Sequence, residues 1–262
     1  MKSYKIKGAR VLTGCLLVSC FTLTNSLLAQ EQGPEKQWHF LAEPYVMFPY
    51  LSGETGIGNA LLVPVDADPG DIFSNLKMAA MLYLEAGTEK WAVTSDLVYM
   101  HLNNEITPGT LIHSGTAEVE QFIWEIAGLY RILPFWEAGI GGRLNYLSTE
   151  LDVRRNVFPA GTEEVTGLHD DTWFDPVFIT RLSTDINDKW LFLFRGDVGG
   201  FGLGSDLTWQ LQAYAGYRFG KLFQLTAGFR VISTDYRKEA EYTDFVFDMK
   251  EFGPVIRFGF NF

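Results

Sequence analysis

The chain has 262 residues, with 32 acidic against 21 basic side chains and a net charge of −11. This balance disfavours nucleic acid as a partner, because the phosphate backbone selects basic surfaces. Both cysteines, Cys15 and Cys20, lie near the N-terminus, so the rest of the chain offers no disulfide framework, Cys-ligated metal or Cys nucleophile.

Residues 1–29 are predicted to be a cleaved secretory signal peptide. Four basic residues precede an apolar run from Val11 to Ala29, which is the order of a signal peptide. A cut after Ala29 leaves residues 30–262 as one domain, with 17 basic against 32 acidic residues and a net charge of −15. Lipobox-like tetrapeptides end at Cys15 and Cys20 and keep a lipoprotein alternative open, but the apolar run continues past both.

The remaining chain alternates apolar and polar residues with period two, which is typical of β-strands. No stretch approaches the ~20 apolar residues of a membrane helix. Each alternating segment reaches about the 9 to 11 residues that cross a bilayer as a tilted strand. In order, the segments are 38–51, 76–86, 91–103, 116–132, 136–153, 173–183, 189–199, 207–219, 222–236 and 245–262.

Short and long connections alternate between these segments. The short ones are 87–90, 133–135, 184–188 and 220–221, and the longer ones are 52–75, 104–115, 154–172, 200–206 and 237–244. Short periplasmic turns and longer outer loops produce this alternation. The sequence therefore predicts an all-β fold, a transmembrane antiparallel up-and-down β-barrel of about ten strands in the Gram-negative outer membrane, with both termini in the periplasm. Eight or twelve strands stay open.

A soluble β-barrel or sandwich would also alternate. Here most lysines of residues 30–262 lie at turns or strand ends, such as Lys90, Lys189 and Lys221, and many aromatic residues lie near strand ends. Aromatic residues at strand ends fit the interfacial girdles of a membrane barrel.

In each predicted strand, one set of alternate residues is apolar and the other is polar. If the apolar set faces lipid, the polar set lies inside the barrel. Buried guanidinium and carboxylate groups are tolerated there when they are paired. Two interpretations stay open, a salt-bridged structural plug and a narrow channel or cavity for a small polar solute. The predicted lumenal charges are Arg131, Arg143, Arg181, Arg195, Arg218, Arg230, Arg257, Glu43, Glu85, Asp96, Glu125, Glu137, Asp175 and Asp197.

The excess acids fall in the longer connections, for example Asp68 and Asp71 in the first and Asp170 and Asp171 in the third. Oxygen-rich loops can hold Ca²⁺ or Mg²⁺ and bridge to lipopolysaccharide, although no cluster has a defined metal-loop spacing. No cofactor or metal ligand is predicted. The expected partners are outer-membrane lipid, lipopolysaccharide and, through the terminal Phe262, the barrel-assembly machinery.

Two alternatives from different classes stay open. One is a surface interaction or lipopolysaccharide-binding barrel, in which the apolar run 60–65 of the first long connection forms a lid over the mouth or a partner surface. The other is an enzyme at the extracellular rim, of a protease or lipid-modifying type. His101 and His113 flank the second long connection, and His169 lies beside Asp170 and Asp171 in the third, so water activation by a His and an Asp is conceivable there. No catalytic residue is assigned, because strand neighbours such as His113 and Ser114 point to opposite faces.

Several short segments carry a family resemblance. They are TWFDP at 172–176, RGDVGGFGLGSDLTWQ at 195–210, AGYRF at 215–219, AGFR at 227–230, DPGDIF at 68–73 and SDLVY at 95–99. With Arg181, Asp235, Tyr236 and the terminal GP…F, they resemble a group of Gram-negative outer-membrane β-barrel proteins of unassigned function. The resemblance implies a barrel and an outer-membrane location, and it implies no activity.

Overall fold

The computed structural model describes residues 38–57, 63–106, 112–156, 161–238 and 245–262. The predicted signal peptide lies outside the described residues. The elements are β1 (His39–Met47), β2 (Tyr50–Ile57), β3 (Val63–Ala67), α1 (Pro69–Ser74), β4 (Leu76–Gly87), β5 (Trp91–Ile106), β6 (Ile112–Leu133), β7 (Trp136–Asn156), β8 (Thr162–Ile186), β9 (Trp190–Gly200), β10 (Leu207–Arg218), β11 (Phe223–Lys238) and β12 (Phe245–Asn261). Among these residues, no helix is long and apolar enough to cross a membrane.

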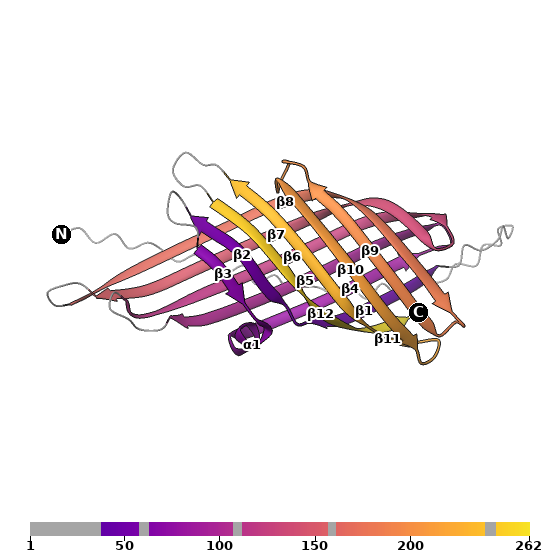
Figure 1. Ribbon diagram of the computed structural model, residues 1–262, viewed down its shortest axis with the longest axis horizontal. Helices are drawn as coiled ribbons and strands as arrows, with labels where there is room; N and C mark the ends of the chain where they lie inside the picture. Colours follow the sequence, from indigo (N-terminus) through magenta and orange to yellow (C-terminus); the bar gives the residue numbers. More distant parts are fainter. Residues whose placement is uncertain (1–37, 58–62, 107–111, 157–160, 239–244) are drawn as a thin grey trace, which may run out of the picture. The chain divides into compact units, whose positions relative to one another are not determined.

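The strands form one closed antiparallel barrel (Figure 1). Consecutive strands from β4 to β12 pair in chain order, and β1 pairs with both β4 and β12. β2 continues along β12 beyond β1, so the two segments act as one strand of the wall. The prediction of an up-and-down barrel of ten strands is thereby confirmed.

The strands β6, β7 and β8 are longer than the sequence predicts, with 22, 21 and 25 residues. The third long connection was expected to cover 154–172, but β8 already begins at Thr162. The outward side chains of β8 turn polar at Thr172 and Asp170, whereas backbone pairing with β7 continues to Asn156. The alternation of apolar and polar residues therefore ends where the outer face becomes polar, but the backbone hydrogen bonding between β7 and β8 continues beyond that point (Figure 1).

The first long connection, expected as a loop over 52–75, is also structured. β2 and β3 form a hairpin, and α1 follows at the end of β3 (Figure 1). Asp68 caps α1 by accepting a hydrogen bond from the Asp71 amide at 2.9 Å, and Asp71 Oδ2 accepts one from the Asp68 amide at 3.3 Å. This reciprocal capping box explains two of the loop acids without a metal ion. The apolar run 60–65 of this connection is described only from Val63, in β3.

A seam separates β1 from the first half of β4. Pairing between the two strands ends at Pro44 and Leu82. The first half of β4, Leu76–Met81, pairs only with β5. Pro44 has no amide hydrogen to donate to a ladder, which suits the edge of a pairing. The stretch Lys77–Ala80 is exposed, as expected for an open edge. At the top of this seam Phe73 of α1 contacts Phe48, with ring centroids 5.5 Å apart.

Exposed aromatic side chains form two rings around the barrel. One follows the short turns, where Trp91 contacts Tyr130 at a centroid distance of 4.8 Å. The other contains Tyr50 stacked on Phe252 at 5.4 Å. The described ends of the barrel meet at the first ring, because Phe40 and Phe262 exchange backbone hydrogen bonds of 3.2 and 2.9 Å.

Candidate functional site

Arg143 on β7 is the centre of an ion-pair network in the middle of the barrel. Its guanidinium donates to Glu125 on β6 at 2.6 Å and to Asp197 on β9 at 2.7 Å. It also donates to Thr208 Oγ1 at 3.1 Å. Arg195 contacts the same two carboxylates from β9. All five side chains are buried, so each charge depends on the others for compensation.

A second group of charges lies toward the short turns. Arg181 donates to Glu137 at 2.5 Å and to Glu85 at 3.0 Å. Arg131 shares Glu137 at 2.9 Å, although its own side chain is 35% exposed. One carboxylate thus joins two arginines from neighbouring strands, and the network continues to this end of the barrel.

Two more arginines form ion pairs with acids elsewhere in the interior. Arg230 pairs with Asp96 at 3.0 Å, and Arg257 pairs with Glu43 at 3.3 Å. The Arg257 guanidinium also lies 4.3 Å from the ring centroid of Tyr214, a distance suited to a cation–π contact. Charged and aromatic side chains therefore fill the cross-section together.

The structure brings most of the predicted lumenal charges together as ion pairs inside the barrel, namely Arg143, Arg181, Arg195, Arg230, Arg257, Glu43, Glu85, Asp96, Glu125, Glu137 and Asp197. Arg131 joins this set through Glu137, although its side chain is 35% exposed. Arg218 lies apart from the set, because it is 31% exposed and pairs with Asp185 at 2.8 Å. Asp175 is fully buried and has no ion-pair partner among the described residues.

Asp175 instead anchors the glycine-rich turn between β9 and β10. Its carboxylate accepts hydrogen bonds from Asn145 Nδ2 at 2.9 Å, from the Ser205 amide at 2.6 Å and from the Ser205 hydroxyl at 2.9 Å. Gly200 and Gly202 have φ values of +87° and +74°, a region that glycine enters without steric cost. The glycines of this motif therefore shape a tight turn held by a buried carboxylate.

Above the network lies a cavity of about 290 Å³, which we call the vestibule. It occupies the mouth opposite the short turns and is lined by β2, β3, α1, β5, β6, β7 and β12. Its walls are mainly apolar, with Leu51, Val65, Ile72, Met100, Leu102, Val119, Leu147, Phe247 and Met249. The sequence did not predict this cavity, because its walls come from distant segments and its inward side chains are not polar.

Gln121 and Glu251 form the floor of the vestibule. Both also line two cavities of about 10 Å³ each that lie toward the barrel centre, and each of these has room for about one water molecule. Gln121 Nε2 donates to Glu251 Oε1 at 2.5 Å. The apolar vestibule therefore ends at a carboxylate, beyond which the interior is closely packed.

An aromatic cluster lies beside the vestibule at the top of the barrel. Trp173 stacks on Tyr236 with a centroid distance of 4.1 Å, and its indole nitrogen donates to Ser205 Oγ at 3.0 Å. The Tyr236 hydroxyl donates to Asp171 at 3.2 Å, and Lys238 pairs with the same carboxylate at 2.8 Å.

The histidines of the rim do not come together as an enzyme site would require. His101 faces outward on β5, where Nε2 is 3.7 Å from Glu118. His169 faces inward on β8, its ring is 4.4 Å from that of Phe245, and its buried Nε2 has no hydrogen-bond partner in the described chain. The described residues also contain no group of three or more His, Cys, Asp or Glu side chains suited to a metal ion.

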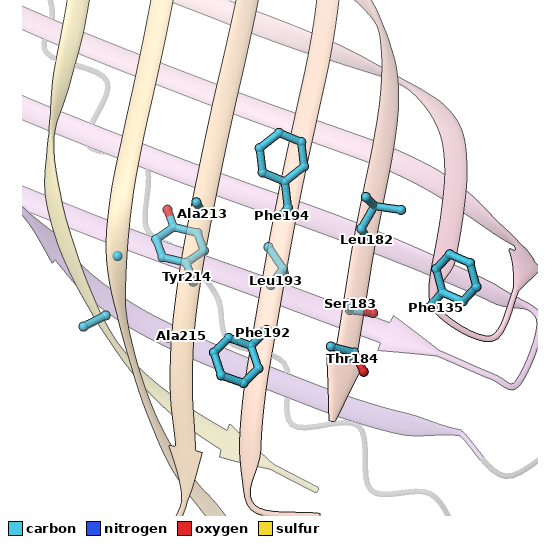
Figure 2. Close-up of a pocket in the computed structure, with 12 residues that line it drawn as sticks. Phe135, Leu182, Ser183, Thr184, Phe192, Leu193, Phe194, Ala213, Tyr214 and Ala215 are labelled. Atoms are coloured by element: carbon cyan, nitrogen blue, oxygen red, sulfur yellow. The ribbon is translucent and has the colours of Figure 1, made fainter. Parts of the chain in front are cut away.

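The outer face of β8 to β11 carries a shallow groove of about 720 Å³. Figure 2 shows Phe192 and Phe194 of β9 beside the small side chains Ala213 and Ala215 of β10. Both phenylalanines are 42% exposed. The groove thus results from large and small side chains next to each other on the outward apolar face.

The sequence matches no protein-family model and no curated protein. Among solved structures, the outer membrane protease OmpT from Escherichia coli is similar with a TM-score of 0.42 and 10% identity, covering 86% of this chain and 96% of that one. The toluene transporter TodX from Pseudomonas putida has a TM-score of 0.37 and 8% identity, with coverages of 87% and 90%. The attachment invasion locus protein Ail from Yersinia pestis has a TM-score of 0.36 and 6% identity, with coverages of 86% and 98%. At these identities no activity transfers to this chain.

Proposed function

We propose that this chain is an outer-membrane barrel that is closed to ions and binds a small, mainly apolar molecule in its vestibule. The membrane location is supported by the two aromatic rings and the apolar band between them. On β7 the outward Trp136 and Tyr146 are ten residues apart, which corresponds to about 33 Å along the strand and about 25 Å along the membrane normal at a tilt of about 40°. Apolar bands of membrane barrels have this height.

The orientation follows from the same rings. The end with the short turns and Phe262 is assigned to the periplasm, and the end with the long hairpins to the outside, as in outer-membrane barrels generally. Outward acids such as Glu118, Glu150 and Asp248 lie beyond the second ring. Membrane lipid and lipopolysaccharide are then the surroundings of the barrel, and Phe262 is the residue we propose for recognition by the assembly machinery.

The closed interior is supported by the ion pairs around Arg143. A barrel of this strand number is only slightly wider than the eight-stranded kind that side chains fill. Arg143, Asp175, Thr208 and Gln210 have at most 1% of their surface exposed. Ions crossing this layer would have to separate buried charge pairs, which costs several kcal/mol for each pair.

The single observation that carries the binding proposal is the apolar wall of the vestibule above this closed layer. Ligand pockets are concave and mainly apolar with a few placed polar groups, and the vestibule fits that description at the small end of the size range. Methionines such as Met100 and Met249 in its wall adapt to different apolar shapes. The class of solute differs from the small polar one predicted from the lumenal charges, because the open part of the interior is apolar.

The test combines conductance with binding. The refolded protein in a planar bilayer with salt on both sides is expected to show no steady openings. Benzyl alcohol added to the micelle-bound protein is expected to shift the methyl NMR signals of Met100 and Met249 saturably. Met78, 58% exposed on the outer face, serves as the internal control for partitioning into detergent.

A filled vestibule supplies the matched control. Ala117 lines the vestibule, so Ala117→Phe fills the cavity and should abolish the saturable shifts. Ala138→Phe, on the outer face of β7, should leave them unchanged. Steady ion conductance would contradict the closed interior. Shifts of Met78 equal to those of Met100, or saturable shifts in Ala117→Phe, would contradict vestibule binding.

A rim hydrolase is not proposed, since the described histidines and carboxylates form no pair inside the mouth. The inward His169 contacts Phe245 rather than an acid, and the outward His101 lies on the opposite face of the wall from it.

A further inference from the structure

Glu251 differs from the other acids inside the barrel. Its Oε1 accepts the hydrogen bond from Gln121, and the described chain provides no ion pair to the carboxylate and no donor to Oε2. Asp175 also lacks an ion pair, but it accepts three hydrogen bonds. Glu251 is only partly buried, and it lines the vestibule and both small cavities beneath it.

The candidate cation beside Glu251, Arg230, already pairs with another carboxylate. Arg230 lies across the small cavity beneath Glu251, but its guanidinium pairs with Asp96 at 3.0 Å and donates to Tyr45 at 2.7 Å. Gln121, which is 8% exposed, holds Glu251 from β6. The carboxylate is therefore fixed in place and lacks a counter-charge of its own.

From this arrangement we infer that the vestibule selects small amphipathic amines, with the ammonium group on Glu251 and the apolar body against Met100, Val119 and Phe247. This inference rests on the proposed function and names the ligand class for the same cavity. An ammonium donates to a carboxylate and balances its charge, which a neutral hydroxyl does only in part. The apolar walls favour a body without further polar groups.

Three size-matched probes separate the contributions of charge and shape. Benzylamine, benzyl alcohol and benzoate share one ring and differ in the head group. Because hydrogen bonds to a charged group are stronger than those between neutral groups, benzylamine is expected to bind the unmodified protein about tenfold more tightly than benzyl alcohol, with benzoate weakest. Methyl shifts of Met100 and Met249 measure each affinity.

Glu251→Gln keeps the size and removes the charge. It should weaken benzylamine about tenfold or more and change the benzyl alcohol affinity less than about threefold. Glu150→Gln, on the exposed outer face of β7, is the matched control and should change neither. If Glu251→Gln does not fold, the order of the three probes on the unmodified protein still decides.

The outcomes distinguish the two proposals. Equal binding of benzylamine and benzyl alcohol, or tighter binding of benzoate, overturns the amine inference and leaves the vestibule as an apolar site. An equal loss of both neutral and cationic probes in Glu251→Gln also overturns it. If none of the three probes shifts Met100 or Met249, the proposed vestibule function itself fails.

Discussion

Replacing Arg143 by alanine is expected to destabilise the folded barrel by about 3–5 kcal/mol. The substitution leaves Glu125 and Asp197 buried, with only Arg195 to offset two carboxylates. Removing one partner of a buried charge network costs more than the net worth of the pair, since the remaining charges cannot regain water. Urea unfolding of the micelle-bound protein, followed by heat-modifiable gel mobility, measures the loss.

Arg154 provides the matched control. It pairs with Glu164, but the two side chains are 57% and 66% exposed, and exposed pairs contribute about 0–1 kcal/mol. Arg154→Ala should therefore unfold nearly as the unmodified protein does. The combined variant Arg143→Met and Asp197→Asn removes one charge of each sign, keeps the ion pair between Arg195 and Glu125, and should recover part of the stability. A loss in Arg143→Ala no larger than in Arg154→Ala would refute the central role of this network.

Trp173→Ala is the second substitution with a large expected effect, about 3–5 kcal/mol. Trp173 is 7% exposed and stacks on Tyr236, and it also donates to Ser205 in the glycine-rich turn. Its removal leaves a cavity between β8 and β11 that rigid strands cannot fill. The same urea titration reports the change in unfolding free energy.

Trp173→Phe separates packing from hydrogen bonding. A phenylalanine keeps one aromatic ring against Tyr236, and it loses the smaller ring of the indole together with the bond to Ser205, which is worth about 1 kcal/mol. The expected order of stability is unmodified protein, Trp173→Phe, then Trp173→Ala. Equal losses in the two variants would mean that the Ser205 bond, and not the stacking, anchors this end of the barrel.

The barrel itself was predictable from the sequence because lipid and lumen impose opposite requirements on alternate residues. The alternation identified every strand of the wall. It alone assigned Trp136 to the outer face and Arg143 to the inside of the barrel. Strand ends were less predictable. Between Thr162 and Thr172 the outer face is polar except at Leu168, so the period-two pattern fades while the backbone pairing with β7 continues.

The candidate site was predictable only in part. The inward positions of the arginines followed from the alternation, but their partners lie on other strands and far along the chain, as Arg143 and Asp197 do at 54 positions apart. The vestibule was missed because inward residues such as Val119 and Met249 are apolar, against the rule used to assign the lumen. The signal for α1 was present in Asp68, Pro69 and Asp71, a capping box with proline at the first helical position, yet six residues are too few for a helical period.

The seam above Pro44 has a consequence for how the barrel comes apart. β1 is joined to β4 by six residue pairs, whereas β7 and β8 share 21. The joint with the fewest residue pairs is the easiest to pull open, so unfolding is expected to begin as a separation of β1 from β4. Hydrogen exchange should then be fastest along Leu76–Met81 and slowest in β7. The lifetime of the closed protein thus depends on a few bonds around Pro44, far from the charges that make its centre stable.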